Sequence, residues 1–415
     1  MYRGRIVVLP ALAVLLASSL AAACTPAAEG NEAGPAVEQT TTPSLDVQDA
    51  PTTTAGTRVD LAAEVLRSLA PEEKIGQLLM PQVYGKADSV SGAQAALNLR
   101  AHGARTPSEI VARHHLGGVI YLEENIESAE QVRLLSRAMQ GAAATDSGIG
   151  LLVAIDQEGG RVSRLSDEVT RFPPASDFSG EAHLVKEASY ITGQQVQQQG
   201  INVVLAPVAD VVDPTAASFI GNRSYGGDPD QVADMVAAAV DGLQQAGVAA
   251  AVKHWPGHGA TSVDSHDFLP ELDIDRALWD QRERLPFDRA IAEGVAIVLV
   301  GHLVLPQLDT TEAPATVSPQ LIDGLLRGDL AFDGVVMTDA LNMGAVSGIP
   351  QGELVVAAVL AGVDVILIPP SLEEATAALT GAVADGTITE ERLDQSVLRV
   401  LRLKERLGLL PSPAS

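Results

Sequence analysis

The sequence predicts an α/β protein with a TIM-like (β/α)8 barrel as its single catalytic domain. Three observations predict this fold. Eight short apolar runs recur along the chain, amphipathic stretches of helical length separate several of them, and ionisable residues follow the ends of five consecutive runs. A continuous apolar run is typical of a parallel strand that is buried on both faces. Eight such strands favour a closed barrel.

The predicted strands are evenly distributed over the chain. In order, the apolar runs are 78–83, 118–121, 151–155, 203–208, 249–252, 296–300, 335–337 and 363–368. The amphipathic stretches 129–143, 230–245, 277–292 and 372–384 predict helices between them. The alternative architecture is an open doubly wound sheet. The sequence has no glycine-rich phosphate loop in the strand and helix context that such a sheet would favour.

The N-terminal residues predict export and a lipid anchor. Arg3 and Arg5 precede the apolar run 6–16, and small residues precede Cys24, which is the one cysteine of the chain. We expect residues 1–23 to be a lipoprotein signal peptide and Cys24 to carry the lipid on the outer face of the cell membrane. An ordinary cleaved signal or a retained anchor is the alternative, because Leu20 lies one position further from the cysteine than in the usual pattern.

The remaining organisation follows from composition. Residues 24–57 are rich in Thr, Pro and Ala and lack apolar periodicity, so they predict a disordered tether to a barrel domain at 58–412. The net charge of -26 argues against nucleic acid as a partner, because phosphate binding needs clustered Lys and Arg. We expect a monomer.

Polar residues concentrate in the sequence KHWPGHGATSVDSH at 253–266. Pro256, Gly257 and Gly259 exclude a regular helix or strand there, so the residues form a loop at the end of the fifth predicted strand. The ends of barrel strands converge on one face, where active sites are built. The other polar strand ends are at Asp156, Asp210, His302 and Asp339.

Two of these groups fit the chemistry of retaining glycoside hydrolysis, which needs a nucleophile and an acid/base. Asp339 can serve as the nucleophile, although an Asp after a strand is often a helix N-cap. Asp264 can hydrogen-bond His266 and raise the proton affinity of its ring, although both can also be solvated loop residues. Polar side chains suited to sugar hydroxyls are Asp156, Arg164, Arg223, Lys253 and His254.

A zinc site is the competing interpretation of the same loop. His254, His258, His266 and Asp264 are all zinc-ligand types. The sequence has no HExxH helix and no strand that ends in His-x-His. These absences weigh against a metal site without excluding it, and we expect no cofactor.

The motifs together resemble glycoside hydrolase family 3, in particular its β-N-acetylglucosaminidases. The resemblance rests on the loop 253–266 and on five further segments in the same order, DQEGGRV at 156–162, LAPVAD at 205–210, NRSYG at 222–226, GH at 301–302 and MTDAL at 337–341. They cover nearly all of residues 60 to 410. Two departures are Ala260, where many relatives carry Asp, and Trp255 in place of the commoner Phe.

The resemblance implies a barrel and a retaining mechanism without a metal. It implies that Asp339 is the nucleophile, that His266 is the acid/base assisted by Asp264, and that the polar set above binds the N-acetylglucosamine ring. The implied substrates are carbohydrates, either cell-wall muropeptides or chitin-type oligosaccharides. The alternatives are a phosphorylase or a β-glucosidase of the same family, and a sugar-binding lipoprotein without catalysis.

Overall fold

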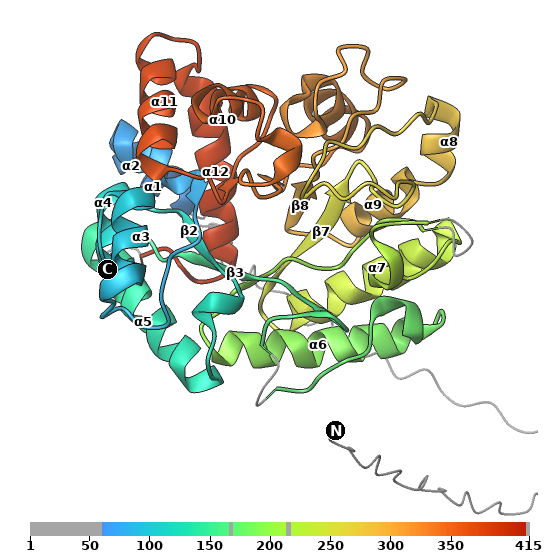
Figure 1. The fold of residues 1–415 in the computed structure, drawn as a ribbon, viewed down its shortest axis with the longest axis horizontal. Helices are drawn as coiled ribbons and strands as arrows, with labels where there is room; N and C mark the ends of the chain where they lie inside the picture. Colours follow the sequence, from blue (N-terminus) through green and yellow to red (C-terminus); the bar gives the residue numbers. More distant parts are fainter. Residues whose placement is uncertain (1–59, 166–168, 213–216, 412–415) are drawn as a thin grey trace, which may run out of the picture. The chain divides into compact units, whose positions relative to one another are not determined.

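The structure is a computed structural model that describes residues 60–165, 169–212 and 217–411 (Figure 1). The predicted signal peptide, Cys24 and the tether lie outside the described residues. Within those residues, no helix is both long enough and apolar enough to span a bilayer. The strand–helix alternation of the sequence is present from α1 to α12.

A parallel barrel forms the centre of the described residues. Its strands are β1 (Leu79–Met80), β2 (Gly118–Tyr121), β3 (Leu152–Ile155), β6 (Val203–Val204), β7 (Ala249–Trp255), β8 (Ile297–Val300), β9 (Val335–Thr338) and β10 (Ile366–Leu367). Six of them pair in the order β2-β3-β6-β7-β8-β9, and β1 pairs with β10. The bridges Gln82–Ile120 and Met337–Val365 join the two groups and close the ring.

Each predicted apolar run therefore overlaps a barrel strand, and the predicted fold class is confirmed. The hydrogen-bonded strands are shorter than several of the runs. Leu78 and Val83, for example, are fully buried on either side of the two-residue strand β1. Burial, which sets the apolar pattern, extends further along the chain than the ladder of strand hydrogen bonds does.

Helices surround the barrel. The α-helices are α1 (Leu61–Ser68), α2 (Pro71–Gln77), α3 (Gly92–His102), α4 (Pro107–His114), α5 (Ala129–Asp146), α6 (Ala182–Gln198), α7 (Pro229–Gln245), α8 (Arg276–Gln281), α9 (Arg284–Ala292), α10 (Gln351–Leu360), α11 (Leu372–Ala384) and α12 (Glu390–Arg406). Single turns are η1 (Glu123–Asn125), η2 (Ala175–Phe178), η3 (Gly221–Arg223), η4 (Ala315–Val317) and η6 (Gly344–Val346), and η5 (Gln320–Asp329) is a π-helix. A small hairpin, β4 (Gln157–Gly159) and β5 (Val162–Ser163), follows β3.

One helix prediction needs correction. The stretch 277–292 was predicted as one helix, whereas the structure has α8 and α9 with a break at Arg282 and Glu283. Pro286 lacks the N–H that a continuous helix would donate to the carbonyl of Arg282, and its ring would clash with that carbonyl. The break places the buried Glu283 beneath the loop that follows β7, against Gly257.

The C-terminal helix α12 covers the end of the barrel where the strands begin. Val400 and Leu403 pack with the side chains that fill the barrel, and the carbonyl of Leu409 accepts a hydrogen bond from Gly150, just before β3. The opposite end, where the strands finish, remains available for the loops. This is the face on which barrel enzymes place their active sites.

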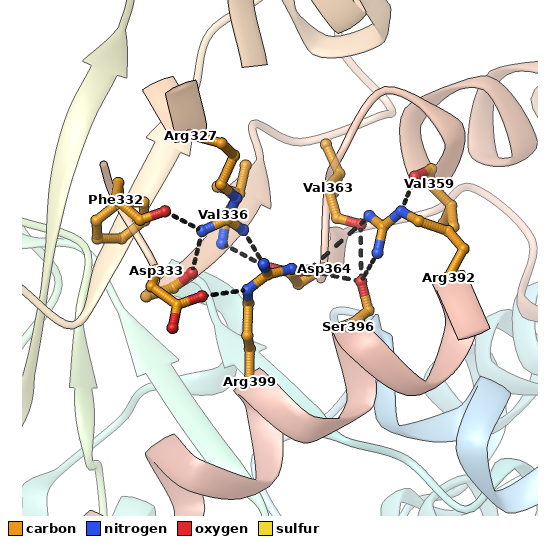
Figure 2. Close-up of polar contacts among 11 residues, drawn as sticks. Arg327, Phe332, Asp333, Val336, Val359, Val363, Asp364, Arg392, Ser396 and Arg399 are labelled. Carbon is orange, nitrogen blue, oxygen red and sulfur yellow. Dashed lines mark hydrogen bonds and ion pairs between the residues drawn. The ribbon is translucent and has the colours of Figure 1, made fainter. Parts of the chain in front are cut away.

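A buried polar network fixes α12 to the last two strands (Figure 2). Asp364, which is 0% exposed, accepts hydrogen bonds from Arg327 at 2.6 Å, the backbone of Val336 at 2.9 Å and Ser396 at 2.6 Å. Arg399 approaches the same carboxylate at 3.4 Å. One carboxylate thus links η5, β9 and α12 to the start of β10.

Candidate active site

The loops after the strands form a pocket of about 300 Å³. All eight residues predicted to bind the sugar or to take part in catalysis line it. The lining residues are Asp156, Glu158, Arg161, Val162, Arg164, Phe219, Arg223, Lys253, His254, Asp264, His266 and Asp339. The barrel therefore brings together side chains that lie up to 183 positions apart in the sequence, from Asp156 to Asp339.

Charged groups from three segments form a compact network on one side of the pocket. The ammonium of Lys253, at the end of β7, donates to Asp156 at 2.8 Å and to Glu158 at 2.7 Å. Glu158 also accepts two parallel hydrogen bonds of 2.8 Å from the guanidinium of Arg223. Two of the predicted sugar donors are therefore held in fixed orientations by a carboxylate between them.

These groups stay charged although they are buried. Burial alone would raise the pKa of Glu158, but the charges and hydrogen bonds of Lys253 and Arg223 lower it to about 2. Burial alone would lower the pKa of Lys253, but Asp156 and Glu158 raise it above its usual value. The network therefore holds charged groups in the pocket at neutral pH, where a ligand hydroxyl could bond to them.

Arg164 completes this side of the pocket. Its guanidinium lies 3.8 Å from the carboxylate of Asp156. Its Nε atom is buried and has no hydrogen-bond partner among the described residues. A buried donor without a partner is costly, so a ligand oxygen that accepted from this atom would be favoured.

His254 is oriented by Asp210, a carboxylate that is fully buried behind the pocket. Its Nδ1–H donates to Asp210 at 2.6 Å, and its backbone N–H donates to the second carboxylate oxygen at 3.2 Å. Burial would raise the pKa of Asp210, but the charge and hydrogen bonds of His254 hold it below its usual value. Nδ1 is occupied by Asp210, and Nε2 lies 3.5 Å from a guanidinium nitrogen of Arg223, so a ligand that contacts Nε2 also meets Arg223.

Asp339 follows β9 directly. Its backbone N–H donates to Val300 at 2.8 Å, and its carboxylate accepts from the N–H of Ala340 at 2.8 Å. Burial would raise its pKa, but the charges of His254 and His302 hold it below its usual value. The carboxylate is ionised at neutral pH, as a nucleophile must be.

The helix-cap interpretation of Asp339 is wrong. The residues that follow it form turns and the single turn η6, and the next helix, α10, begins only at Gln351. The carboxylate therefore does not cap a helix but lies in the pocket.

His266 and Asp264 form the predicted pair. Oδ1 of Asp264 accepts the ring Nδ1–H of His266 at 2.8 Å and its backbone N–H at 2.9 Å. The His266 side chain is 62% exposed, and its ring meets Phe219 edge-on at 5.7 Å between centroids. Because Nδ1 is fixed by Asp264, Nε2 is free to exchange a proton with a substrate.

The histidines of the zinc interpretation are separated by their own protein contacts. His254 bonds Asp210, His266 bonds Asp264, and Nε2 of His258 lies 3.0 Å from the hydroxyl of Ser265. Among the described residues, no group of three or more His, Cys, Asp or Glu side chains has the arrangement of a metal site. The zinc interpretation finds no geometric support there.

The sequence interpretation did not assign five residues that the structure places in or directly behind the site, one of which is the pocket-lining Val162. Glu158, Arg161 and Phe219 line the pocket, and Asp210 lies behind it. Glu158 stands two positions after Asp156 in DQEGG, and Asp210 ends the fourth apolar run, so both had a local signal. Phe219 had none, because its apolar side chain gives no hint of a polar pocket.

Comparisons with known proteins agree with this site. Residues 71–403 match the family described as glycosyl hydrolase family 3 N terminal domain. A β-hexosaminidase of Stenotrophomonas maltophilia (strain K279a) is 34% identical over 325 residues, which cover 71% of this chain and 92% of that protein. A solved family 3 β-N-acetylglucosaminidase from Paenibacillus sp. str. FPU-7 has 40% identity and a TM-score of 0.76, and the match covers 84% of this chain and 64% of that one.

Some relatives are longer than the matched region. The β-hexosaminidase A of Pseudoalteromonas piscicida is 34% identical over 329 residues, which are 72% of this chain but 55% of that protein. The chain thus spans little more than half of that relative. The family model nevertheless covers the whole barrel, from α2 to α12. The chain therefore belongs to glycosyl hydrolase family 3.

Proposed function

We propose that this glycoside hydrolase releases terminal β-linked N-acetylglucosamine with retention of configuration. The observation that carries the proposal is that one pocket holds both the ionised carboxylate of Asp339 and the Asp264–His266 pair. Relatives named β-hexosaminidase and β-N-acetylglucosaminidase support the choice of sugar.

In the first step, Asp339 attacks the anomeric carbon and forms a covalent glycosyl-enzyme. The Nε2–H of His266 gives its proton to the leaving oxygen, so the departing group leaves as a neutral alcohol. Asp264 stabilises the charged imidazolium before this transfer. In the second step, Nε2 takes a proton from water, the water oxygen bonds to the anomeric carbon, and the bond to Asp339 breaks.

The remaining side chains hold the ring. Asp156 accepts from sugar hydroxyls, Arg164, Arg223 and Lys253 donate to them, and Nε2 of His254 contacts the ring beside Arg223. Their partners in the protein already fix their directions, so little freedom is lost when the sugar binds. Removal of one such donor should weaken the binding of a substrate that carries the matching hydroxyl.

The proposed setting is outside the cell. The N-terminal pattern supports export and attachment through Cys24, which would place the barrel on the outer face of the membrane, on a tether. The substrates that we propose for this location are cell-wall muropeptides and chitin-type oligosaccharides, which contain β-linked N-acetylglucosamine. We base exo action on the size of the pocket, about 300 Å³, which lies at the lower end of the range for pockets that bind small molecules.

The direct test is hydrolysis of 4-nitrophenyl N-acetyl-β-glucosaminide by residues 58–415, with EDTA and with added phosphate. Turnover that survives EDTA and does not need phosphate supports the proposal. Loss in EDTA would support the zinc interpretation, and dependence on phosphate would identify a phosphorylase. If 4-nitrophenyl β-glucoside is cleaved and the N-acetyl-β-glucosaminide is not, the enzyme is a β-glucosidase. Binding of N-acetylglucosamine without turnover of any oligosaccharide would indicate a sugar-binding protein.

A further inference from the structure

The exposed ring of His266 stands beside a buried residue. The side chain of His266 is 62% exposed, whereas the preceding residue, Ser265, is 2% exposed. Asp264 turns the His266 ring, but it lies on the same loop and cannot fix the distance from that loop to Asp339. The position of the acid/base relative to the nucleophile therefore depends on what holds Ser265.

Ser265 is held from two directions. Its hydroxyl lies 3.0 Å from Nε2 of His258, at the other end of the same loop. Its carbonyl accepts from the N–H of Ala345 at 3.2 Å, and the carbonyl of His266 accepts from the N–H of Gly344 at 2.7 Å. Gly344 and Ala345 belong to the segment that follows Asp339, so these bonds connect the acid/base loop to the nucleophile's own loop.

His258 is well placed to act as the fixed end of this connection. It is 1% exposed, and its backbone N–H donates to the buried Asp210 at 2.7 Å. Phe219 packs against its ring at 5.9 Å between centroids and against the His266 ring at 5.7 Å. His258 therefore belongs to the rigid base of the pocket, and Ser265 belongs to the loop above it.

The hydrogen bond between them has a defined direction. Burial and the charge of His254 lower the pKa of His258, so its ring is neutral and carries a single N–H. Nδ1 has no partner among the described residues. We assign the proton to Nε2, where the Ser265 hydroxyl can accept it, because a proton on Nδ1 would have no acceptor there.

We propose that His258 and Ser265 are positioning residues, whose hydrogen bond sets the distance between His266 and Asp339. Neither touches the reacting atoms. Their effect on the reaction passes through the placement of Nε2 of His266, and a shift of about 1 Å in such a group costs up to about 100-fold in rate. This inference rests on the proposed function.

The test compares Ser265→Ala with Ser262→Ala, an exposed serine on the same loop that serves as the control. Ser265→Ala should lower kcat/KM about tenfold for N,N′-diacetylchitobiose, whose leaving sugar needs a proton. For the 2,4-dinitrophenyl glycoside, whose leaving group needs none, kcat/KM should change less than about twofold. His258→Asn should show the same pattern, and the double variant should be no worse than the single ones. Equal losses on both substrates, or no loss on either, would refute the positioning role.

A second measurement does not depend on activity. The amides of Gly344 and Ala345 donate to the loop, so their hydrogen exchange reports whether the loop stays attached. They should exchange about tenfold faster in Ser265→Ala and at the wild-type rate in Ser262→Ala. Unchanged exchange in Ser265→Ala would refute the connection. If the wild-type protein cleaves no N-acetylglucosaminide, the proposed function fails and the positioning role fails with it, while the exchange result still decides whether the contact between His258 and Ser265 holds the loop.

Discussion

Asp339 and His266 are held in different ways, and this difference governs what their replacement does. The carboxylate of Asp339 lies at the end of a barrel strand, bonded to the N–H of Ala340 and influenced by the charges of His254 and His302. His266 stands on a long loop with most of its side chain exposed. The proposed nucleophile belongs to the rigid scaffold, and the proposed acid/base belongs to the part of the site that loop contacts must place.

Replacement of Asp339 by Asn should abolish turnover and leave the fold intact. The amide oxygen of Asn can still accept from Ala340, but it cannot form the glycosyl-enzyme. We expect kcat for the 4-nitrophenyl glycoside to fall by at least about 10⁴-fold, with a midpoint of thermal unfolding within about 3 °C of wild type. Asp267→Asn, an exposed acid beside His266, is the control and should be fully active. Residual activity above one per cent would exclude Asp339 as the nucleophile.

Replacement of His266 by Ala should separate substrates by leaving group. General acid catalysis contributes about 10²–10⁴-fold, so kcat/KM for diacetylchitobiose should fall by that range. The 2,4-dinitrophenyl glycoside should keep kcat/KM within about tenfold of wild type, because its leaving group departs without a proton. Its kcat should fall, since water then lacks a base in the second step, and azide should restore it. Equal losses in kcat/KM on both substrates would count against the acid role.

The helix α12 shows how one element is fixed to the barrel. Arg392 and Arg399 on α12 and Arg327 on η5 all lie within 4 Å of the carboxylate of Asp364, together with the Ser396 hydroxyl (Figure 2). A single buried anion thus compensates several cations that the strands and helices bring together. Removal of one partner from such a network leaves the others buried without compensation.

Replacement of Asp364 by Asn should therefore lower the free energy of unfolding by about 3–5 kcal/mol. Asp333→Asn is a matched control, because Asp333 is 75% exposed and pairs with the same Arg399 at 3.1 Å. An exposed pair of this kind contributes about 1 kcal/mol or less. Urea denaturation of both variants at pH 7 measures the difference. Equal small effects would show that the arginines find other partners when Asp364 loses its charge.

Buried ionisable groups make the stability of the whole barrel depend on pH. Lys404 on α12 is fully buried, its ammonium donates to Gln77 at 2.6 Å, and burial lowers its pKa from 10.5 to about 7. Between pH 7 and pH 10.5 the unfolded chain holds this proton and the folded chain does not. The free energy of unfolding therefore rises with pH over that window. The cost of keeping the charged ammonium of Lys404 buried is largest below pH 7.

Lys404→Met tests this dependence. From pH 7 to pH 9 the wild-type free energy of unfolding should rise by about 2 kcal/mol relative to the variant, since one proton gives about 1.4 kcal/mol per pH unit. Lys74→Met serves as the control, because Lys74 is partly exposed and pairs with Asp394. Denaturation curves at pH 7, 8 and 9 supply the comparison. If the free energies of unfolding of wild type and Lys404→Met differed by the same amount at all three pH values, Lys404 would not titrate in this range.

At acid pH the buried His102 also makes the free energy of unfolding rise with pH. Burial lowers the pKa of His102 to about 4, so between pH 6.5 and pH 4 the unfolded chain binds a proton that the folded chain does not. Stability is therefore lost as pH falls through this window. His102→Asn should flatten the loss between pH 6.5 and pH 4, as measured by thermal unfolding. An unchanged pH profile in the variant would contradict this account.

The sequence by itself determined the eight barrel strands, the face that carries the polar residues and membership of family 3. Apolar runs and motifs can be read from neighbouring residues. In a barrel of parallel strands, all strands end on the same face, whatever the sequence of the loops. Asp156, Lys253 and Asp339 could therefore be placed together in advance. The signal peptide at residues 1–23, the lipid on Cys24 and the tether up to residue 57 stay predictions.

Only the tertiary structure decided which partners these residues have. Lys253 and Asp156 are 97 positions apart, and Glu158 lies 65 positions from Arg223, so no local pattern pairs them. The break before α9, the Asp364 network and the contact of His258 with Ser265 likewise depend on how elements pack. Local periodicity reports whether a side chain is buried, whereas its partner is set by the fold, because contacts between distant segments exist only after the barrel closes.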